Sequence, residues 1–288
     1  MTKIALLICG TIRNYKENYL TWKKYLLDLF DVTIFFHTYD IYGYHSQNNN
    51  KLSQLDIDAL IGIIKPKKYL IESYTNKLND FKAQIKTQCL RRGSPKPECI
   101  KSQLYSIYMV NMLKKIDEKE NNFKYDVVIK IRFDTIFYSN FSTKDIELIN
   151  KFDNVILCGN PKIKTMLYKN ACKNCIDNYN KGNYIKCTKH TDISDIVIIS
   201  TSKIMNHYAN IYFVYDQFII EYHNKVKLSY SDKELEKYKV QKYDNGAIMY
   251  CNVPKISCLY PECALALHFK NFILLNYTID VDTNRNIL

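Results

Sequence analysis

The stretch Tyr-Asp-Val-Val-Ile-Lys-Ile-Arg-Phe-Asp, residues 125–134, is a hydrophobic run of strand length that ends in charged side chains. A second such run, Lys-Ile-Ala-Leu-Leu-Ile-Cys at residues 3–9, leads into the turn Gly-Thr-Ile-Arg. Short apolar runs bounded by turn signals are consistent with strands that are buried on both faces of a sheet. The two runs therefore predict buried strands around which the fold is built.

Helical and extended patterns alternate around these two runs. Apolar residues recur at helical spacing from Tyr15 to Phe30, and Ser53 with Asp56 resembles a capping box that opens a helix ending before Pro66. The other expected elements are strands at 32–38, 69–74, 154–158, 195–201 and 247–253, and helices at 100–119, 202–222 and 261–270. Strands separated by helices of this length predict an α/β fold with a mostly parallel sheet flanked by helices.

Composition excludes several classes of protein. The 288 residues are 47% hydrophobic and 14% aromatic, with only 7 Gly and 6 Pro, which excludes disordered and collagen-like chains. No window approaches the roughly 20 apolar residues of a membrane-spanning helix, and residues 4–9 are too short for a signal-peptide core. We expect one domain over residues 1–288, in the cytoplasm and at most peripheral to membranes, with a small Cys-rich insert at 165–191.

The net charge of +12 comes from 41 Lys and Arg against 29 Asp and Glu. Arg91, Arg92, Lys96 and Lys101 cluster, but the lysines are spread along the chain without an arginine-rich stripe. A basic surface, or a cleft for an anionic nucleotide and acceptor, explains the charge as well as nucleic acid does. A basic nucleic-acid-binding protein with a zinc site therefore stays as the alternative function.

Polar residues follow three of the expected strands. They are Gly10, Thr11 and Arg13 after the first, His37, Thr38 and Asp40 at the second, and Arg132 and Asp134 after 125–131. Ligands of open α/β sheets bind beyond the carboxyl ends of the strands, so these groups should converge on one edge.

Two of these groups have a specific chemical interpretation. Gly10 allows close backbone approach, and Arg13 could clamp a phosphate through its planar fork; the alternative is a tight turn followed by a surface arginine. Alternation puts Arg132 and Asp134 on one side of the strand. The carboxylate could hold Mg²⁺ or Mn²⁺ against a diphosphate, with the arginine adding positive charge for the leaving group, or the two could form a structural ion pair.

These segments resemble a group of GT-A-like, Rossmann-related glycosyltransferases found in large DNA viruses, algae and some bacteria. The matching segments are 3–13, 32–40, Ser102 to Ser106, 125–134, 195–198 and 261–262. The resemblance implies a virus-encoded or host-cytoplasmic enzyme. It would move a sugar from a nucleotide diphosphate sugar to a hydroxyl of a glycan, lipid-linked or protein acceptor. A catalytically inactive scaffold of the same fold is the alternative.

The resemblance also implies roles for individual residues. Arg13, beside Gly10 and Thr11, would lie near the diphosphate, and Asp134 would bind Mn²⁺ or Mg²⁺ as the second acid of an Asp-x-Asp motif. Arg132 stands where that motif has its first acid, so it could replace part of the cation's charge.

The resemblance further implies that Thr38 and Gln103 contact the nucleoside. Asp195 and Glu262 are candidates for acceptor binding or for the general base that deprotonates the acceptor hydroxyl. The alternative for both acids is capping: Asp195 precedes a strand, and Glu262 lies in the first turn of a helix.

The insert has a metal-binding pattern of its own. Cys172 and Cys175 form one pair, and Cys187 and His190 form another, each with two intervening residues. Four such ligands suit tetrahedral Zn²⁺, and the segment between them has few apolar residues with which to build a core. The spacing predicts one structural zinc ion; chance clustering or surface thiols are the alternative.

Overall fold

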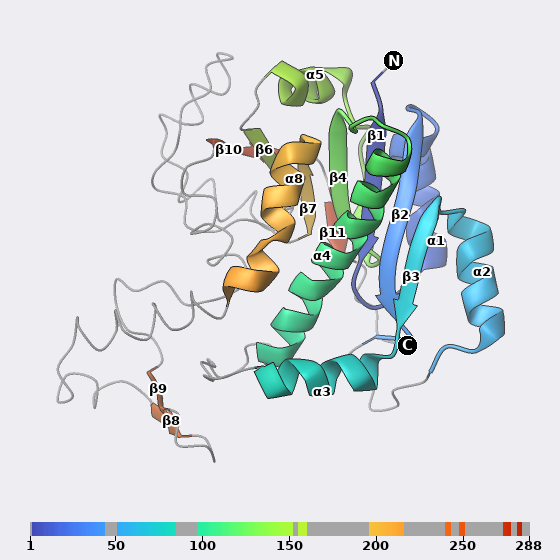
Figure 1. Ribbon diagram of the computed structural model, residues 1–288. Helices are drawn as coiled ribbons and strands as arrows, with labels where there is room; N and C mark the ends of the chain where they lie inside the picture. Colours follow the sequence, from blue (N-terminus) through green and yellow to red (C-terminus); the bar gives the residue numbers. More distant parts are fainter. Residues whose placement is uncertain are drawn as a thin grey trace.

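A computed structural model describes residues 2–43, 51–84, 97–151, 155–159, 196–215, 240–242, 248–250, 273–277 and 281–283. Its centre is a seven-stranded sheet with the order β10-β6-β7-β4-β1-β2-β3 (Figure 1). The strands are β1 (Ile4–Cys9), β2 (Val32–Tyr39), β3 (Lys68–Glu72), β4 (Val127–Arg132), β6 (Val155–Gly159), β7 (Val197–Ser200) and β10 (Ile273–Tyr277). Two small sheets pair β5 (Thr135–Phe137) with β11 (Val281–Thr283) and β8 (Val240–Lys242) with β9 (Ile248–Tyr250).

Most of the main sheet is parallel, as the sequence predicts. β1 pairs in parallel with β2 and β4, β2 with β3, and β6 with β10. β7 is the exception, because it runs antiparallel to both β4 and β6. The carboxyl ends of β1, β2, β3 and β4 therefore meet at one edge of the sheet, where the candidate residues lie.

Helices cover both faces of the sheet. They are α1 (Tyr15–Trp22), which continues as a π-helix (Lys23–Leu27), α2 (Gln54–Ile64), α3 (Tyr74–Gln84), α4 (Pro97–Glu120), α5 (Thr143–Lys151) and α8 (Ser202–Ala209). Ile4, Leu6 and Ile8 of β1 belong to a buried cluster with residues of α1, α2 and α5. Ala5, Leu7 and Cys9 belong to a second cluster with residues of α4 and α8, the helices on the face turned to the viewer in Figure 1. Burial on both faces explains why the strands are uninterrupted apolar runs.

The ends of α2 confirm the predicted boundary signals. The Ser53 hydroxyl accepts a hydrogen bond from the Asp56 backbone N–H at 3.2 Å, and Asp56 Oδ2 accepts one from the Ser53 N–H at 2.9 Å. The helix ends at Ile64, and Lys65 takes a left-handed conformation with φ of 49° before Pro66. Reciprocal capping satisfies backbone donors that the first helical turn leaves unpaired.

Other boundaries differ from the expectation. α4 begins at Pro97, because proline is well tolerated in the first turn of a helix. β3 ends at Glu72, and Tyr74 opens α3, a helix that the sequence pattern did not predict. The insert at 165–191 and the helix expected at 261–270 lie outside the described residues. Within the described chain, none of the helices combines the length and the apolar character that a membrane crossing requires.

Candidate functional site at the carboxyl ends of the strands

The loops after β1 and β2 run side by side over this edge. Gly10 leaves β1 with φ of +100°, a backbone conformation that side-chain-bearing residues rarely adopt. Ile12 then forms a parallel bridge with Tyr42, and the Gly43 N–H donates to the Ile12 carbonyl at 3.2 Å. A Cβ on Gly43 would lie 3.7 Å from Arg13 Nε, so the Arg13 side chain passes directly over this glycine. The pairing of the two loops thus fixes the backbone position of Arg13.

Helix α1 brings the β1 loop to the turn between β4 and β5. The Asn18 side-chain amide donates to the Phe133 carbonyl at 2.8 Å. The Trp22 indole N–H donates to the Thr135 carbonyl at 2.7 Å. Because Arg13 precedes α1 and Asp134 lies between these two carbonyls, the contacts bring Arg13 and Asp134 together.

Arg13, Arg132 and Asp134 form what we call the strand-end cluster. Arg132 donates from Nε to Asp134 Oδ1 at 2.9 Å and from Nη2 to Oδ2 at 2.7 Å, a bidentate pair. Arg13 donates from Nη1 to the same Oδ2 at 3.3 Å. The Asp134 side chain is 2% exposed, whereas Arg13 is 24% and Arg132 17% exposed. The cluster thus carries two partly exposed guanidinium groups and one buried carboxylate, and it confirms that Arg132 and Asp134 share one side.

The described donor set at Asp134 does not fit a divalent cation. Mg²⁺ and Mn²⁺ require several oxygen ligands, usually including carboxylates that are open to the ion. Both Asp134 oxygens already accept hydrogen bonds from arginine. Among the residues that the structure describes, no three His, Cys, Asp or Glu side chains gather as a metal site.

A second chain of polar contacts runs behind the β1 loop, and we call it the histidine chain. His37 of β2 is fully buried, with Nε2 at 2.9 Å from Glu72 Oε2 and Nδ1 at 2.7 Å from Ser106 Oγ. Ser106 Oγ also accepts a hydrogen bond from the Gly10 backbone N–H at 2.8 Å. The chain therefore links the ends of β3, β2 and β1 through one residue of α4.

The charges along the histidine chain are well defined. Burial lowers the pKa of His37 and outweighs the opposing effect of the hydrogen bond to Glu72, so the ring is neutral at pH 7. Burial acts to raise the pKa of Glu72, but hydrogen bonds from His37, Lys77 and Tyr105 outweigh it and lower that pKa to about 2. An ionised Glu72 can only accept, so His37 donates from Nε2 and accepts from Ser106 at Nδ1.

The other predicted site residues have different positions. Thr38 is fully buried, and its hydroxyl has no hydrogen-bond partner in the described part of the chain. Gln103 lies on α4, one turn before Ser106, at the same end of the sheet. Asp195, Glu262, Cys172, Cys175, Cys187 and His190 lie outside the described residues. From the sequence, His37 was expected near the site without a role, and Ser106 and Glu72 were not predicted as site residues. Only the fold brings the three together.

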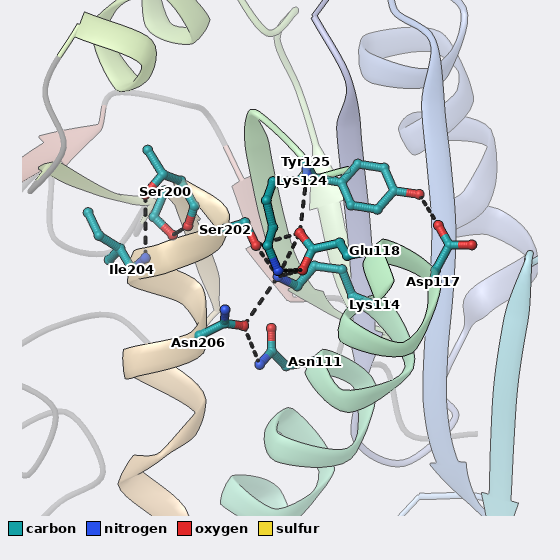
Figure 2. A network of polar contacts seen from close by, with 11 residues as sticks. Asn111, Lys114, Asp117, Glu118, Lys124, Tyr125, Ser200, Ser202, Ile204 and Asn206 are labelled. Carbon is teal, nitrogen blue, oxygen red and sulfur yellow. Dashed lines mark hydrogen bonds and ion pairs between the residues drawn. The ribbon is translucent and has the colours of Figure 1, made fainter. Parts of the chain in front are cut away.

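A third polar group, the α4–α8 network, joins α4 and α8 beside the segment that leads into β4 (Figure 2). The Lys114 ammonium donates to both Glu118 oxygens at 3.3 Å, to the Ser202 hydroxyl, and to Asn206 Oδ1 at 3.3 Å. The Ser202 hydroxyl donates to Glu118 Oε1 at 2.5 Å. Lys114 and Glu118 side chains are both 0% exposed. One buried positive charge thus faces one buried negative charge.

A hollow of about 770 Å³ lies beside this network. Its lining residues are Lys124, Tyr125, Asp126, Asn150, Thr201, Ser202, Lys203 and Asn206. We nevertheless place the candidate site at the strand-end cluster. There the Arg13 and Arg132 side chains reach solvent at the carboxyl ends of β1 and β4, where ligands of open α/β sheets bind, whereas the hollow lies before the amino end of β4.

Comparisons with known proteins add structural neighbours. No protein-family model and no curated protein match the sequence. The chain is similar to the apo crystal structure of mouse xyloside xylosyltransferase 1, with a TM-score of 0.37 and 11% identity over 78% of this chain and 76% of that one. It is also similar to the apo structure of the bifunctional glycosyltransferase WbbM, with a TM-score of 0.36 and 11% identity over 74% of this chain and 34% of that one. Both neighbours are glycosyltransferases by name.

Proposed function

We propose that the protein is a glycosyltransferase that uses a nucleotide diphosphate sugar as donor. The strand-end cluster is the observation that carries this proposal. Arg13 and Arg132 converge at the carboxyl ends of β1 and β4, held by one buried carboxylate and partly open to solvent. Guanidinium groups bind phosphate oxygens through paired N–H donors, so two of them at one sheet edge suit a diphosphate.

Asp134 sets the geometry of the cluster. Its bidentate pair with Arg132 fixes the plane of that guanidinium, and its contact with Arg13 brings the second cation within reach of the same ligand. When the sugar–phosphate bond breaks, its electron pair goes to the departing diphosphate oxygen. Two positioned cations stabilise that developing charge without rearrangement at the moment of reaction.

The remaining roles complete the proposal. The acceptor is a hydroxyl of a glycan, lipid-linked or protein substrate, and Asp195 or Glu262 takes its proton as the new bond forms to the anomeric carbon. Gln103 contacts the nucleoside, while Gly10 and Thr11 keep the loop close to the phosphates; Thr38, which is fully buried, lies beneath this surface. The enzyme acts in the cytoplasm, and the insert folds around zinc held by Cys172, Cys175, Cys187 and His190.

The described residues do not support the divalent cation that the resemblance implies. Asp134 would be the ligand for Mn²⁺ or Mg²⁺, but its oxygens are taken by arginine. We therefore propose that Arg13 and Arg132 supply the charge that a cation supplies elsewhere. Excess chelator should leave nucleoside diphosphate binding within about twofold, a change of less than 1 kcal/mol. A loss of binding that Mn²⁺ restores would overturn this point.

The test begins with ligands and then follows turnover. A panel of nucleoside diphosphates and nucleotide sugars is screened by thermal shift, and hydrolysis of each nucleotide sugar is followed with and without Mn²⁺. We expect a rise in Tm of a few degrees for the matching nucleotide, because ligands that bind only the folded state stabilise it. Binding without turnover or transfer would indicate an inactive scaffold. The absence of any shift across the panel would refute the proposal.

A further inference from the structure

We propose that Ser106 and His37 are positioning residues that hold the Gly10 N–H, and with it the Arg13 loop, in the conformation that binds the donor diphosphate. The proposal rests on the function proposed above. It assigns a use to three polar side chains that the sequence pattern left unconnected: Glu72, His37 and Ser106.

The first step is the anchor on the β1 loop. The Gly10 N–H donates to Ser106 Oγ at 2.8 Å, and Gly10 is the residue at which the backbone leaves β1 with φ of +100°. The direction of that turn decides where Thr11 and Arg13 lie. Since Ser106 is on α4, the long helix packed across β1 and β2, its hydroxyl is a fixed point against which the loop is held.

The second step is the direction of the hydrogen bonds. Ser106 Oγ accepts from Gly10, so its own hydrogen points elsewhere. His37 Nδ1 at 2.7 Å is a closer acceptor for it than the His37 backbone carbonyl at 3.3 Å. His37 Nδ1 is an acceptor because Nε2 donates to the Glu72 carboxylate at 2.9 Å. Glu72 is held in turn by Lys77 at 3.1 Å and Tyr105 at 3.4 Å. The donors therefore run in one direction, from the Gly10 N–H through Ser106 and His37 to the Glu72 carboxylate.

The arrangement of acid, histidine and serine invites a nucleophilic interpretation, but the geometry excludes it. A serine nucleophile must reach the substrate. Ser106 is 0% exposed, lies behind the β1 backbone, and has its oxygen occupied by the Gly10 N–H. The chain can orient the loop from behind, and it cannot attack a ligand in front of it.

The test uses Ser106→Ala, with Ser102→Ala as the matched control. Ser102 is also buried and lies one turn earlier on α4, and its backbone carbonyl, which accepts from the Tyr39 hydroxyl, is kept by the substitution. We expect Ser106→Ala to speed amide exchange at Gly10 about tenfold and to weaken nucleoside diphosphate binding by about the same factor, the effect of one hydrogen bond. Ser106→Thr, which retains the hydroxyl, should recover most of both losses.

Amide exchange at Gly10, followed by NMR, does not depend on any ligand. If wild type binds no nucleoside diphosphate, the proposed function fails, while the exchange rates still decide whether Ser106 holds the loop. If Ser106→Ala and Ser102→Ala exchange alike at Gly10, the positioning role is overturned. It is also overturned if Gly10 exchanges faster but nucleotide affinity is unchanged in a wild-type background that binds.

Discussion

Charged side chains at the two ends of the central strands of the main sheet are arranged in opposite ways. At the carboxyl ends of β1 and β4, two guanidinium groups share the Asp134 carboxylate, and both reach solvent at 24% and 17% exposure. At the other end, Lys114 and Glu118 are both 0% exposed and the charges balance. The first group is in contact with solvent, whereas the buried pair fastens elements of the fold to one another.

The pKa values of the α4–α8 network fit this interpretation. Burial lowers the pKa of Lys114 to about 8, against the raising effect of the Glu118 charge. Burial acts to raise the pKa of Glu118, but the Ser202 hydrogen bond and the Lys114 charge lower it overall. The pair therefore remains ionised at pH 7, and its contacts join α4, α8 and the start of β4.

The largest effect is expected from breaking the balanced pair. Glu118→Leu leaves the Lys114 ammonium buried without its counter-charge, which should lower the free energy of unfolding by about 3–5 kcal/mol. The measurement is urea denaturation. Lys114→Met combined with Glu118→Leu removes both charges and should recover part of the loss, because the Tyr125 N–H and the Ser202 hydroxyl still lose their acceptor. A single-variant cost below about 1 kcal/mol would show that the network does not fasten the helices.

The next effect concerns the cationic edge. Arg132→Met or Arg13→Met should lower kcat/KM for sugar transfer about 10²- to 10³-fold, the usual result of removing one group that stabilises developing charge. Lys203→Met is the matched control, because it removes an exposed positive charge at the opposite end. An equal loss of activity in all three variants would contradict a specific role of Arg13 and Arg132 in sugar transfer.

Acid should lower the free energy of unfolding through Glu72 of the histidine chain. Its folded pKa of about 2 lies below the value of 4.5 expected for an unperturbed glutamate, so the unfolded chain binds more protons between these pH values. Stability from Glu72 is therefore complete above pH 5 and is lost as pH falls toward 2. Because the side chain is 17% exposed, we expect about 1–2 kcal/mol after allowance for solvent screening.

The measurement for Glu72 is the free energy of unfolding of wild type and Glu72→Gln between pH 3 and pH 7. The difference between the two proteins should shrink as the pH falls below 4.5, because the unfolded wild-type chain then binds a proton at Glu72 that the folded protein does not. A difference that stays constant over this range would contradict the assigned pKa.

The smallest effect is expected at the cap of α2, away from both groups of charges, and it provides a control for general destabilisation. Ser53→Ala removes the cap of α2, which should cost about 1 kcal/mol of unfolding free energy and leave nucleotide binding unchanged. Thermal and urea denaturation measure the first, and calorimetric titration the second. Weakened nucleotide binding in this variant would mean that general destabilisation, and not local geometry, explains losses at the arginines.

Features set by local pattern could be predicted from the sequence. The buried strands β1 and β4, the Ser53 capping box and the shared side of Arg132 and Asp134 follow from apolar runs, capping residues and alternation. The direction of β7 does not, because Val-Ile-Ile-Ser pairs equally well in either direction. In sequence, Lys114 and Glu118 look like an exposed i,i+4 pair, and only the packing of α8 shows that they are buried.

The histidine chain shows why part of the site could not be predicted. His37 lies 35 residues from Glu72 and 69 from Ser106 in sequence, and none of the three has a local pattern that names its partner. The contact between Arg13 and Asp134 spans 121 residues and depends on where α1 lies on the β4–β5 turn. The rule that ligands bind at the carboxyl ends of parallel strands predicted where the site lies, but which side chains contact one another there depends on tertiary packing.

The antiparallel strand β7 has a consequence for how the sheet comes apart. β1 shares six residue pairs with β2 and six with β4, but β7 shares only three with β4 and three with β6. Within the described strands, β6 and β10 join the rest of the sheet through β7 alone. The pairing across β7 is therefore the least extensive in the described part of the main sheet. Under mild denaturant, β6 and β10 should separate first, while β4-β1-β2-β3 keeps its order and keeps both arginines in place.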